Sequence, residues 1–255
     1  MGLKTTASNV NDEASRRNSH IDRLLKAEKG AARKTTTVLL LGAADHLGKS
    51  TIVKQMRMIP SDGFSEQEQQ GVLRAQSPRE GATEVIFTQA GINWRMVDLC
   101  GQTLERKKWM PCLGDVDCLV FVVALSSYDH CLAEGHCTNQ MREAMKLFDS
   151  SANSDHFKSK PILLILDKLD VFEEKLNHSP ISGHFPDFHD SAATFWAAAE
   201  YFGHLFQQIN RTQGREICVH YTNTTDDNFL KSMMALLYQI VMAQRLRSHG
   251  VLDIH

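Results

Sequence analysis

The chain lacks a strong net charge and a long apolar run. Its 255 residues carry 28 Lys and Arg against 30 Asp and Glu, a formal charge of −2, so the basic surface typical of nucleic-acid-binding proteins is missing. No apolar run is long enough to span a bilayer. We find no internal repeat and no low-complexity tract. The composition therefore favours one globular domain with short appendages.

A secretory signal is also missing from the N-terminal sequence, although the chain has six cysteines. Disulfides form in oxidising compartments and are rare in the cytosol. We therefore expect free thiols in a reducing compartment.

A strand, a loop and a helix are predicted around residues 36–56. The apolar run before Gly42 is typical of a buried strand, and Ile52, Val53 and Met56 recur at helical spacing. The segment between them contains Gly48-Lys49-Ser50-Thr51. Such a loop presents the N–H groups of a helix N-terminus to an anion, while its lysine reaches the β- and γ-phosphates and its serine hydroxyl ligates Mg²⁺. The sequence predicts a nucleotide-phosphate site.

The spacing of this loop is irregular. Ala43 stands where the usual pattern has its first glycine, and Gly42 lies one residue too far upstream. The alternative interpretation is a glycine-containing connection that binds nothing.

Apolar strands alternate with amphipathic helices over the rest of the chain. Residues 85–87 and 94–98 resemble a hairpin around Ala90-Gly91, and residues 118–125 and 162–166 are continuous apolar runs of the kind a parallel sheet buries. Helices are predicted over 141–148, 192–209 and 229–246, with Phe229, Met233, Leu236, Leu237 and Ile240 on one apolar face, and core packing is predicted for the aromatic set Phe185, Phe188, Phe195, Trp196, Tyr201, Phe202 and Phe206. The pattern predicts an α/β fold with a wound sheet flanked by helices.

Several of these segments resemble the α subunit of heterotrimeric G proteins. They are Leu39-Leu40-Leu41-Gly42, Gly48 to Met56, Asp98-Leu99-Cys100-Gly101-Gln102, Glu105 to Trp109, Val123 to Ser126 with Tyr128-Asp129, Met145 to Asp149, and Asp170 to Leu176. The resemblance implies a P-loop GTPase (Ras-like) fold, a GTP/GDP switch with Mg²⁺, and three partners: a βγ dimer, an effector and a G-protein-coupled receptor that contacts the C-terminal helix.

The family's all-helical lid domain is missing from this sequence. In the family it lies between the first helix and a Val-Leu-Arg segment, but here only residues 59 to 71 separate Met58 from Val72-Leu73-Arg74. That span is far below the roughly 50 residues of a small domain. We predict an N-terminal helix and tail over 1–34 and a Ras-like domain over 35–255, with faster nucleotide exchange than in a covered site.

The resemblance assigns site residues one by one. The nucleotide contacts are Asp45, His46, Leu47, Gly48, Lys49, Ser50, Thr51, Gly101, Asp167, Lys168, Asp170 and Thr224. Ser50 and Asp98 are assigned to Mg²⁺, and Gln102 matches the glutamine that orients the attacking water.

The chemistry of the site departs from the family at three positions. Gln76 replaces the catalytic arginine, and Arg79 replaces the threonine that ligates Mg²⁺. Asp167 replaces an asparagine, and an ionised carboxylate cannot donate to guanine N7. The resemblance therefore implies weakened guanine binding and slow GTP hydrolysis.

The N-terminus matches the pattern for myristoylation at Gly2, with Thr6 as the required hydroxyl residue. One acyl chain binds membranes only marginally, so a partner protein is the expected second anchor. Residues 11–32 are predicted to form a polar helix with a narrow apolar side. The expected location is cytoplasmic, peripheral on the inner face of the plasma membrane.

Three hypotheses remain open. The first is a divergent, lid-less α subunit that binds guanine nucleotide weakly, and the retained Lys49, Gln102 and Asp170 favour it. The second is a pseudo-GTPase that binds βγ or an effector without turnover, which Gln76, Arg79, Asp167 and the irregular phosphate loop favour. The third is an abnormal transcript.

Overall fold

The computed structural model describes residues 35–42, 49–56, 82–99, 116–131, 138–189, 194–215, 217–226 and 228–248. Its six strands form one sheet in the order β2-β3-β1-β4-β5-β6. They are β1 (Thr35–Gly42), β2 (Ala82–Gln89), β3 (Ile92–Leu99), β4 (Cys118–Ala124), β5 (Ile162–Asp167) and β6 (Ile217–Tyr221). All neighbours pair in parallel except β2 and β3. The predicted wound α/β sheet is confirmed.

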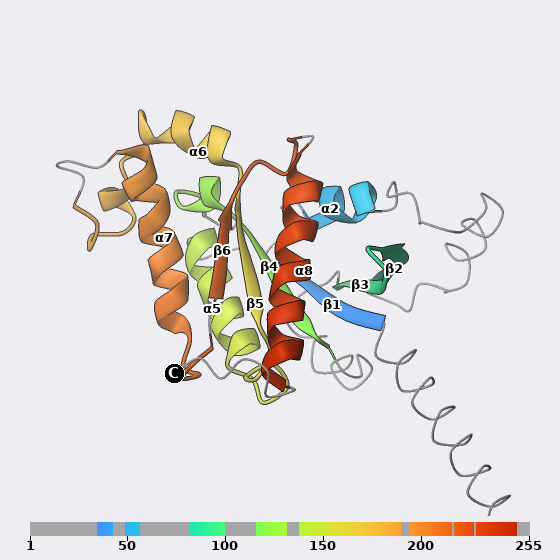
Figure 1. Cartoon of the computed structure of the whole chain (residues 1–255). Coiled ribbons are helices and arrows are strands. Elements are labelled where there is room, and N and C mark those ends of the chain that lie inside the picture. Colours follow the sequence, from blue (N-terminus) through green and yellow to red (C-terminus); the bar gives the residue numbers. More distant parts are fainter. Residues whose placement is uncertain are drawn as a thin grey trace, which may run out of the picture.

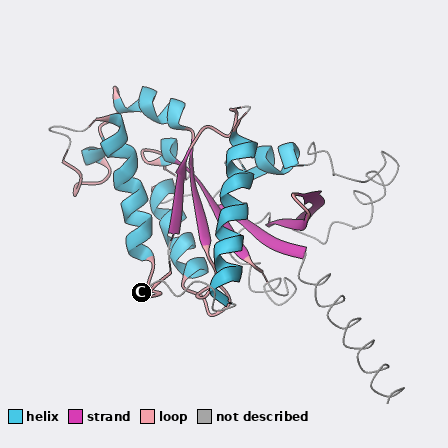
Figure 2. Cartoon of the chain, in the orientation of Figure 1, coloured by secondary structure: helices cyan, strands magenta, loops and turns pink. Residues whose placement is uncertain are grey.

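Helices cover both faces of this sheet (Figures 1 and 2). They are α2 (Lys49–Met56), α5 (Gln140–Ala152), α6 (Leu169–Leu176), α7 (Phe195–Ile209) and α8 (Phe229–Ser248), with short 3-10 turns η2 (Leu125–Ser127) and η3 (Ile181–Gly183). Every residue of β4 and β5 is buried. A central parallel strand needs such cover on each face, which explains why β4 is apolar at every position, and β5 at every position before its last residue Asp167, rather than at alternate ones.

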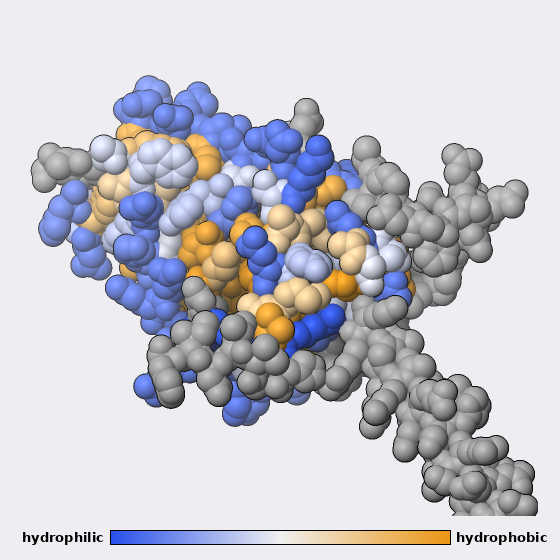
Figure 3. Space-filling view, viewed as in Figure 1, coloured by the Kyte–Doolittle hydropathy of each residue, from blue (hydrophilic) through white to orange (hydrophobic). Residues whose placement is uncertain are grey.

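The two faces have separate cores. Side chains of α5 and α7 pack on one face around Phe121, whereas α2 and α8 pack on the other around Val120. Neighbouring residues of β4 point to opposite faces because a strand has a period of two. Around the edge strand β6, between α7 and α8, apolar side chains show at the surface (Figure 3).

The β2–β3 hairpin turns on two residues, as predicted. Ala90 has φ 51° and Gly91 has φ 70°, so both central residues lie in the left-handed region that a type I′ turn requires. This turn matches the twist of the two strands and sets the register Gln89 opposite Ile92.

Side-chain caps fix the starts of two predicted helices. The Asn139 side chain accepts from Arg142 N before α5, and the Thr194 hydroxyl accepts from Ala197 N before α7. The α5 helix is longer at both ends than the predicted 141–148, whereas α7 begins three residues after the predicted start. Capping satisfies N–H groups that have no partner within the helix, so it decides where these two helices start.

Two expectations are wrong. Trp196 is 54% exposed and lies outside the aromatic core, although it contacts Phe195 and Tyr221 edge to face. Cys131 is disulfide-bonded, so the expectation of free thiols throughout fails there. Cys118 and Cys218 are not disulfide-bonded.

Within the described ranges, no helix has the length and apolar character to cross a membrane. The predicted tail and helix over 1–34 lie outside these ranges, as does the 59–72 junction where the lid domain is expected to be missing.

Candidate functional site

The residues assigned to the site gather at one edge of the sheet. Because parallel strands end at a common edge, the residues after them meet there, and ligands of open α/β sheets bind at that edge. Lys49 begins α2, Asp98 lies near the end of β3, Asp167 ends β5, and Thr224 follows β6. We call the part of this edge around Lys49 and Asp98 the phosphate side, and the part around Asp167 and Thr224 the base side, after the contacts predicted for these residues.

The ammonium of Lys49 defines the phosphate side. It lies 3.5 Å from the carbonyl oxygen of Leu99 and 4.0 Å from Asp98 Oδ1. The side chains of Lys49 and Asp98 are 6% and 5% exposed. A buried cation beside a strand end is suited to bind an anion, because low solvent exposure strengthens charge interactions.

Gly42 has a packing role that its position in the sequence pattern did not reveal. A Cβ at this residue would lie 2.7 Å from the carbonyl oxygen of Val122 and 3.1 Å from Lys49 Cδ. Glycine therefore lets the end of β1 pack against β4 and leaves room for the lysine side chain. The loop pattern did not predict this packing role, because Gly42 lies one residue outside it.

Asp167 and Thr224 form the centre of the base side. Asp167 is fully buried, and its Oδ1 accepts from Thr224 N at 2.7 Å while its Oδ2 accepts from Thr224 Oγ1 at 2.9 Å. Burial raises the pKa of the Asp167 carboxyl, although the hydrogen bonds from Thr224 and from the backbone of Lys168 act in the opposite direction.

The start of α6 places the remaining base-side residues. Lys168 caps the helix in the left-handed conformation with φ 63°. Asp170 is exposed, and its backbone N–H donates to Asn223 Oδ1 at 3.1 Å. Asn223 was not among the predicted site residues, and its position next to the predicted residue Thr224 in the loop after β6 is the signal that could have found it.

A second contact missed by sequence reasoning joins the two sides. Gln55 lies on α2, the helix that Lys49 begins, and its Nε2 donates to the carbonyl oxygen of Thr224 at 3.1 Å. The loop after β6 is thereby bonded to both β5 and α2.

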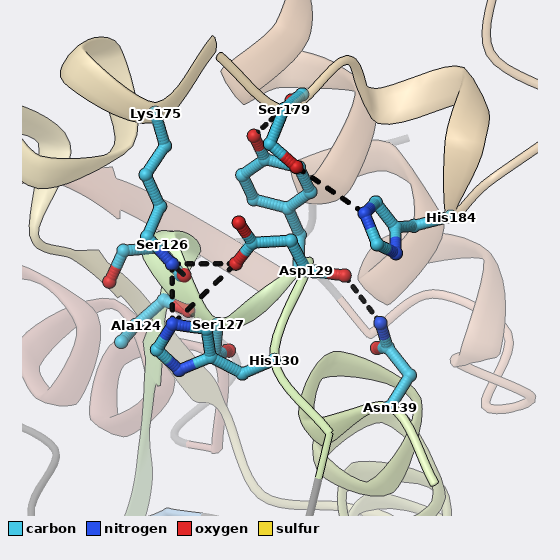
Figure 4. Close-up of polar contacts among 10 residues, drawn as sticks. Ala124, Ser126, Ser127, Asp129, His130, Asn139, Lys175, Ser179 and His184 are labelled. Carbon is cyan, nitrogen blue, oxygen red and sulfur yellow. Dashed lines mark hydrogen bonds and ion pairs between the residues drawn. The ribbon is translucent and has the colours of Figure 1, made fainter. Parts of the chain in front are cut away.

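The α6 helix is fixed at its other end by Lys175 (Figure 4). The ammonium donates to Ser126 O at 2.8 Å, to Asp129 Oδ1 at 2.6 Å and to His130 Nε2 at 2.6 Å. These partners come from η2 and the turn after it. Burial alone raises the pKa of Asp129, but the hydrogen bond and the charge of Lys175 outweigh it, and the pKa is lowered.

Further hydrogen bonds continue this cluster. The Tyr128 hydroxyl donates to the carbonyl oxygen of Ser179, and Ser179 Oγ lies 3.3 Å from His184 Nε2. Asn139 Nδ2 donates to the carbonyl oxygen of Tyr128. The turn after η2, the segment after α6 and the residue that caps α5 are thus tied together.

Many predicted site residues lie outside the described ranges. They are Asp45, His46, Leu47, Gly48, Gln76, Arg79, Gly101, Gln102 and the acylation site Gly2. For Ser50 the structure gives the backbone, in the first turn of α2, and not the side chain.

The phosphate side has donor chemistry that fits Mg²⁺. The ion prefers hard oxygen ligands, usually one or two carboxylates with water and phosphate oxygens. Asp98 is a buried carboxylate next to the lysine, and Ser50 lies at the start of the same helix. When bound, Mg²⁺ would neutralise charge on the phosphates.

The sheet order, the phosphate-side lysine and the base-side loops define the class of protein as a P-loop GTPase. A family model described as G-protein alpha subunit matches residues 68–241. The chain belongs to the G-protein alpha subunit family.

Curated relatives agree with this assignment. The guanine nucleotide-binding protein alpha-2 subunit of Neurospora crassa is 40% identical over 190 residues, 74% of this chain and 52% of that protein. The alpha-7 subunit of Caenorhabditis elegans is 37% identical over 72% of this chain and 52% of its own. The alpha subunit of Emericella nidulans is 36% identical, with shares of 78% and 54%. The chain thus spans about half the length of these relatives.

Proposed function

We propose that this chain is a guanine nucleotide-binding switch in G-protein-coupled receptor signalling that lacks the helical lid, recognises the base weakly and hydrolyses GTP slowly. The observation that carries the proposal is the common sheet edge, where the Lys49–Asp98 pair lies on one side and Thr224 and Asp170 on the other. Lys49 would hold the phosphates, and Asp170 would accept from the guanine N1–H and N2–H₂. The order of strand ends along the edge supports this direction for a bound nucleotide.

Slow hydrolysis follows from the residues at the reacting phosphate. Gln76 carries no fixed positive charge to stabilise the transferring phosphoryl group, and Arg79 cannot ligate a cation. Gln102 is retained to orient water, and Asp98 with Ser50 would hold Mg²⁺. We expect binding to survive these departures better than turnover.

The partners and location belong to the same proposal. A βγ dimer, an effector and a receptor at the C-terminal helix are proposed from family membership. Acylation of Gly2 would place the protein peripherally on the cytoplasmic face of the plasma membrane, with βγ as the second anchor.

The second candidate is a pseudo-GTPase that binds βγ or an effector without turnover. The engagement of both Asp167 carboxylate oxygens with Thr224 favours it, because that carboxylate offers no donor to a base.

Equilibrium binding of GDP and of a non-hydrolysable GTP analogue, with and without Mg²⁺, tests the proposal. We expect Kd values of about 1 μM to 100 μM, tighter with Mg²⁺, and a loss of at least about 100-fold in Lys49→Ala. Lys54→Ala is the matched control, because Lys54 is exposed on the same helix. No binding at millimolar nucleotide by folded protein would reject the switch.

Single-turnover hydrolysis separates the two candidates. A slow rate that Gln102→Leu abolishes supports the switch. Nucleotide binding with no turnover in either protein supports the pseudo-GTPase.

A further inference from the structure

Thr224 uses every polar group it has in hydrogen bonds within the chain. Its N–H and its hydroxyl donate to the two oxygens of Asp167, and its carbonyl oxygen accepts from Gln55 Nε2. Asp167 ends β5, Thr224 lies in the loop after β6, and Gln55 lies on α2. One residue thus joins the base side to the helix that begins with Lys49.

We propose that Asp167 is a positioning residue that, through Thr224 and Gln55, holds the base-side loop in register with the phosphate-side helix. The inference deepens the proposed function and rests on it. It changes the role of Asp167 from a contact to the base into a support for the loop that contacts it.

The hydrogen-bond capacity of the carboxylate supports this role. An ionised carboxylate only accepts hydrogen bonds, and each oxygen of Asp167 already has a donor from Thr224. The residue is fully buried, so water does not reach its carboxylate to take the place of these donors. Leaving the buried carboxylate without them would be unfavourable. Its chemistry therefore matches the backbone and hydroxyl donors of the loop.

The backbone around Asp167 makes this support rigid. Asp167 pairs with Ala124 of β4 within the sheet, and Thr222 N donates to Leu166 O at 3.0 Å just before the loop. Asn223 ties the same loop to Asp170 on α6. A loop held at three successive residues has little freedom to lose when a ligand binds, and that lowers the cost of binding.

The test uses the full chain and two probes, GDP and inorganic pyrophosphate. Pyrophosphate reports on the phosphate side, and GDP reports on both sides. In Asp167→Ala we expect the Kd for GDP to rise about tenfold, the loss typical of hydrogen bonds to a charged group, while the Kd for pyrophosphate stays within about twofold. In Thr224→Val and Gln55→Met we expect rises of about threefold for GDP alone.

The controls separate positioning from general damage. Thr224→Ser keeps the hydroxyl and should restore GDP binding. Thr88→Val removes a hydroxyl that donates to Asn93 Oδ1 at 2.8 Å in the exposed hairpin, and it should change neither Kd. Hydrogen exchange of the unliganded proteins gives a second readout. The Thr224 amide should exchange at least about tenfold faster in Asp167→Ala, because its acceptor is gone, while amides of β4 keep their rates.

The outcomes are distinct. If wild-type protein binds GDP and the variants lose both probes equally, or if the Thr224 amide keeps its exchange rate, the assignment of Asp167 is wrong while the proposed function stands. If folded wild-type protein binds neither probe, the proposed function fails and the assignment of Asp167 fails with it.

Discussion

The phosphate side and the base side of the same sheet edge are held together differently. On the phosphate side, Lys49 has its partners at 3.5 Å and 4.0 Å. On the base side, Thr224 and Lys175 make hydrogen bonds of 2.6 to 3.1 Å. Hydrogen bonds weaken steeply with distance, so the lysine can turn to an anion at small cost. The base side is organised by the protein's own hydrogen bonds, and we propose that a bound ligand completes the phosphate side.

We expect the largest loss of unfolding free energy from a substitution at Gly42, beside the phosphate side. In Gly42→Ala the new Cβ would lie 2.7 Å from a backbone oxygen of β4, and overpacking of this kind costs about 3 kcal/mol. Urea unfolding measures the loss of unfolding free energy. Gly183→Ala is the matched control, because nothing lies within 4 Å of its Cβ position. Equal effects in the two variants would show that the close approach of β1 and β4 is unimportant.

We expect the next largest effect when the hydrogen bonds that Lys175 makes from α6 are removed. Lys175→Met keeps the aliphatic stem but leaves Ser126 O and Asp129 without their cation, which should lower the unfolding free energy by about 2 kcal/mol. Lys146→Met removes an exposed pair with Glu143 and should change it by less than about 0.5 kcal/mol. The base side would prove less organised than the hydrogen bonds indicate if Lys175→Met matched this control.

Two carboxylates should show opposite pH dependence. Burial raises the pKa of Asp167 above its unfolded value of 3.8, so its contribution to stability is present below that pH and is lost as the pH rises through the folded value. The pKa of Asp129 is lowered by Lys175, against the effect of burial, so its contribution is present above pH 3.8 and is lost as the pH falls.

Urea unfolding of Asp167→Asn and Asp129→Asn across pH 3 to 8 checks these signs. The stability of wild type relative to Asp167→Asn should decrease from about pH 4 upward, and relative to Asp129→Asn it should decrease below that pH. Slopes of the same sign would contradict the assigned environments.

The smallest expected effects concern recognition of the base and are measured with analogues of GDP. With Asp167 engaged on Thr224 and unable to donate, replacing guanine N7 by a C–H group removes nothing, so 7-deaza-GDP and GDP should bind within about twofold. Inosine diphosphate lacks the 2-amino group proposed to meet Asp170 and should bind about tenfold more weakly. Competition binding measures both ratios. A strong preference for GDP over the 7-deaza analogue would reveal another donor to N7.

Sequence patterns predicted most of the fold because burial leaves a direct trace in residue type. The runs 118–124 and 162–166 are apolar throughout since both faces of these strands are covered. The Ala90-Gly91 hairpin was predictable because its turn depends on two adjacent residues. Trp196 was misplaced because helical spacing does not say which aromatic residue lies over the sheet and which lies beyond it. The disulfide at Cys131 was missed because the expectation rested on compartment alone.

The features of the site likewise divide into those that the sequence determined and those that only the tertiary structure decided. By itself the sequence determined the alternation of strands and helices, the position of Lys49 at the start of a helix, the acidic residues at strand ends and the family, since these depend on residue type and local spacing. Only the tertiary structure decided that Gly42 serves the contact between β1 and β4, that Asp167 supports Thr224, and that Gln55 joins the two sides. The last two contacts join residues 57 and 169 positions apart in the sequence. No local pattern encodes such pairings, because the packing of the helices and loops against the sheet brings the residues together.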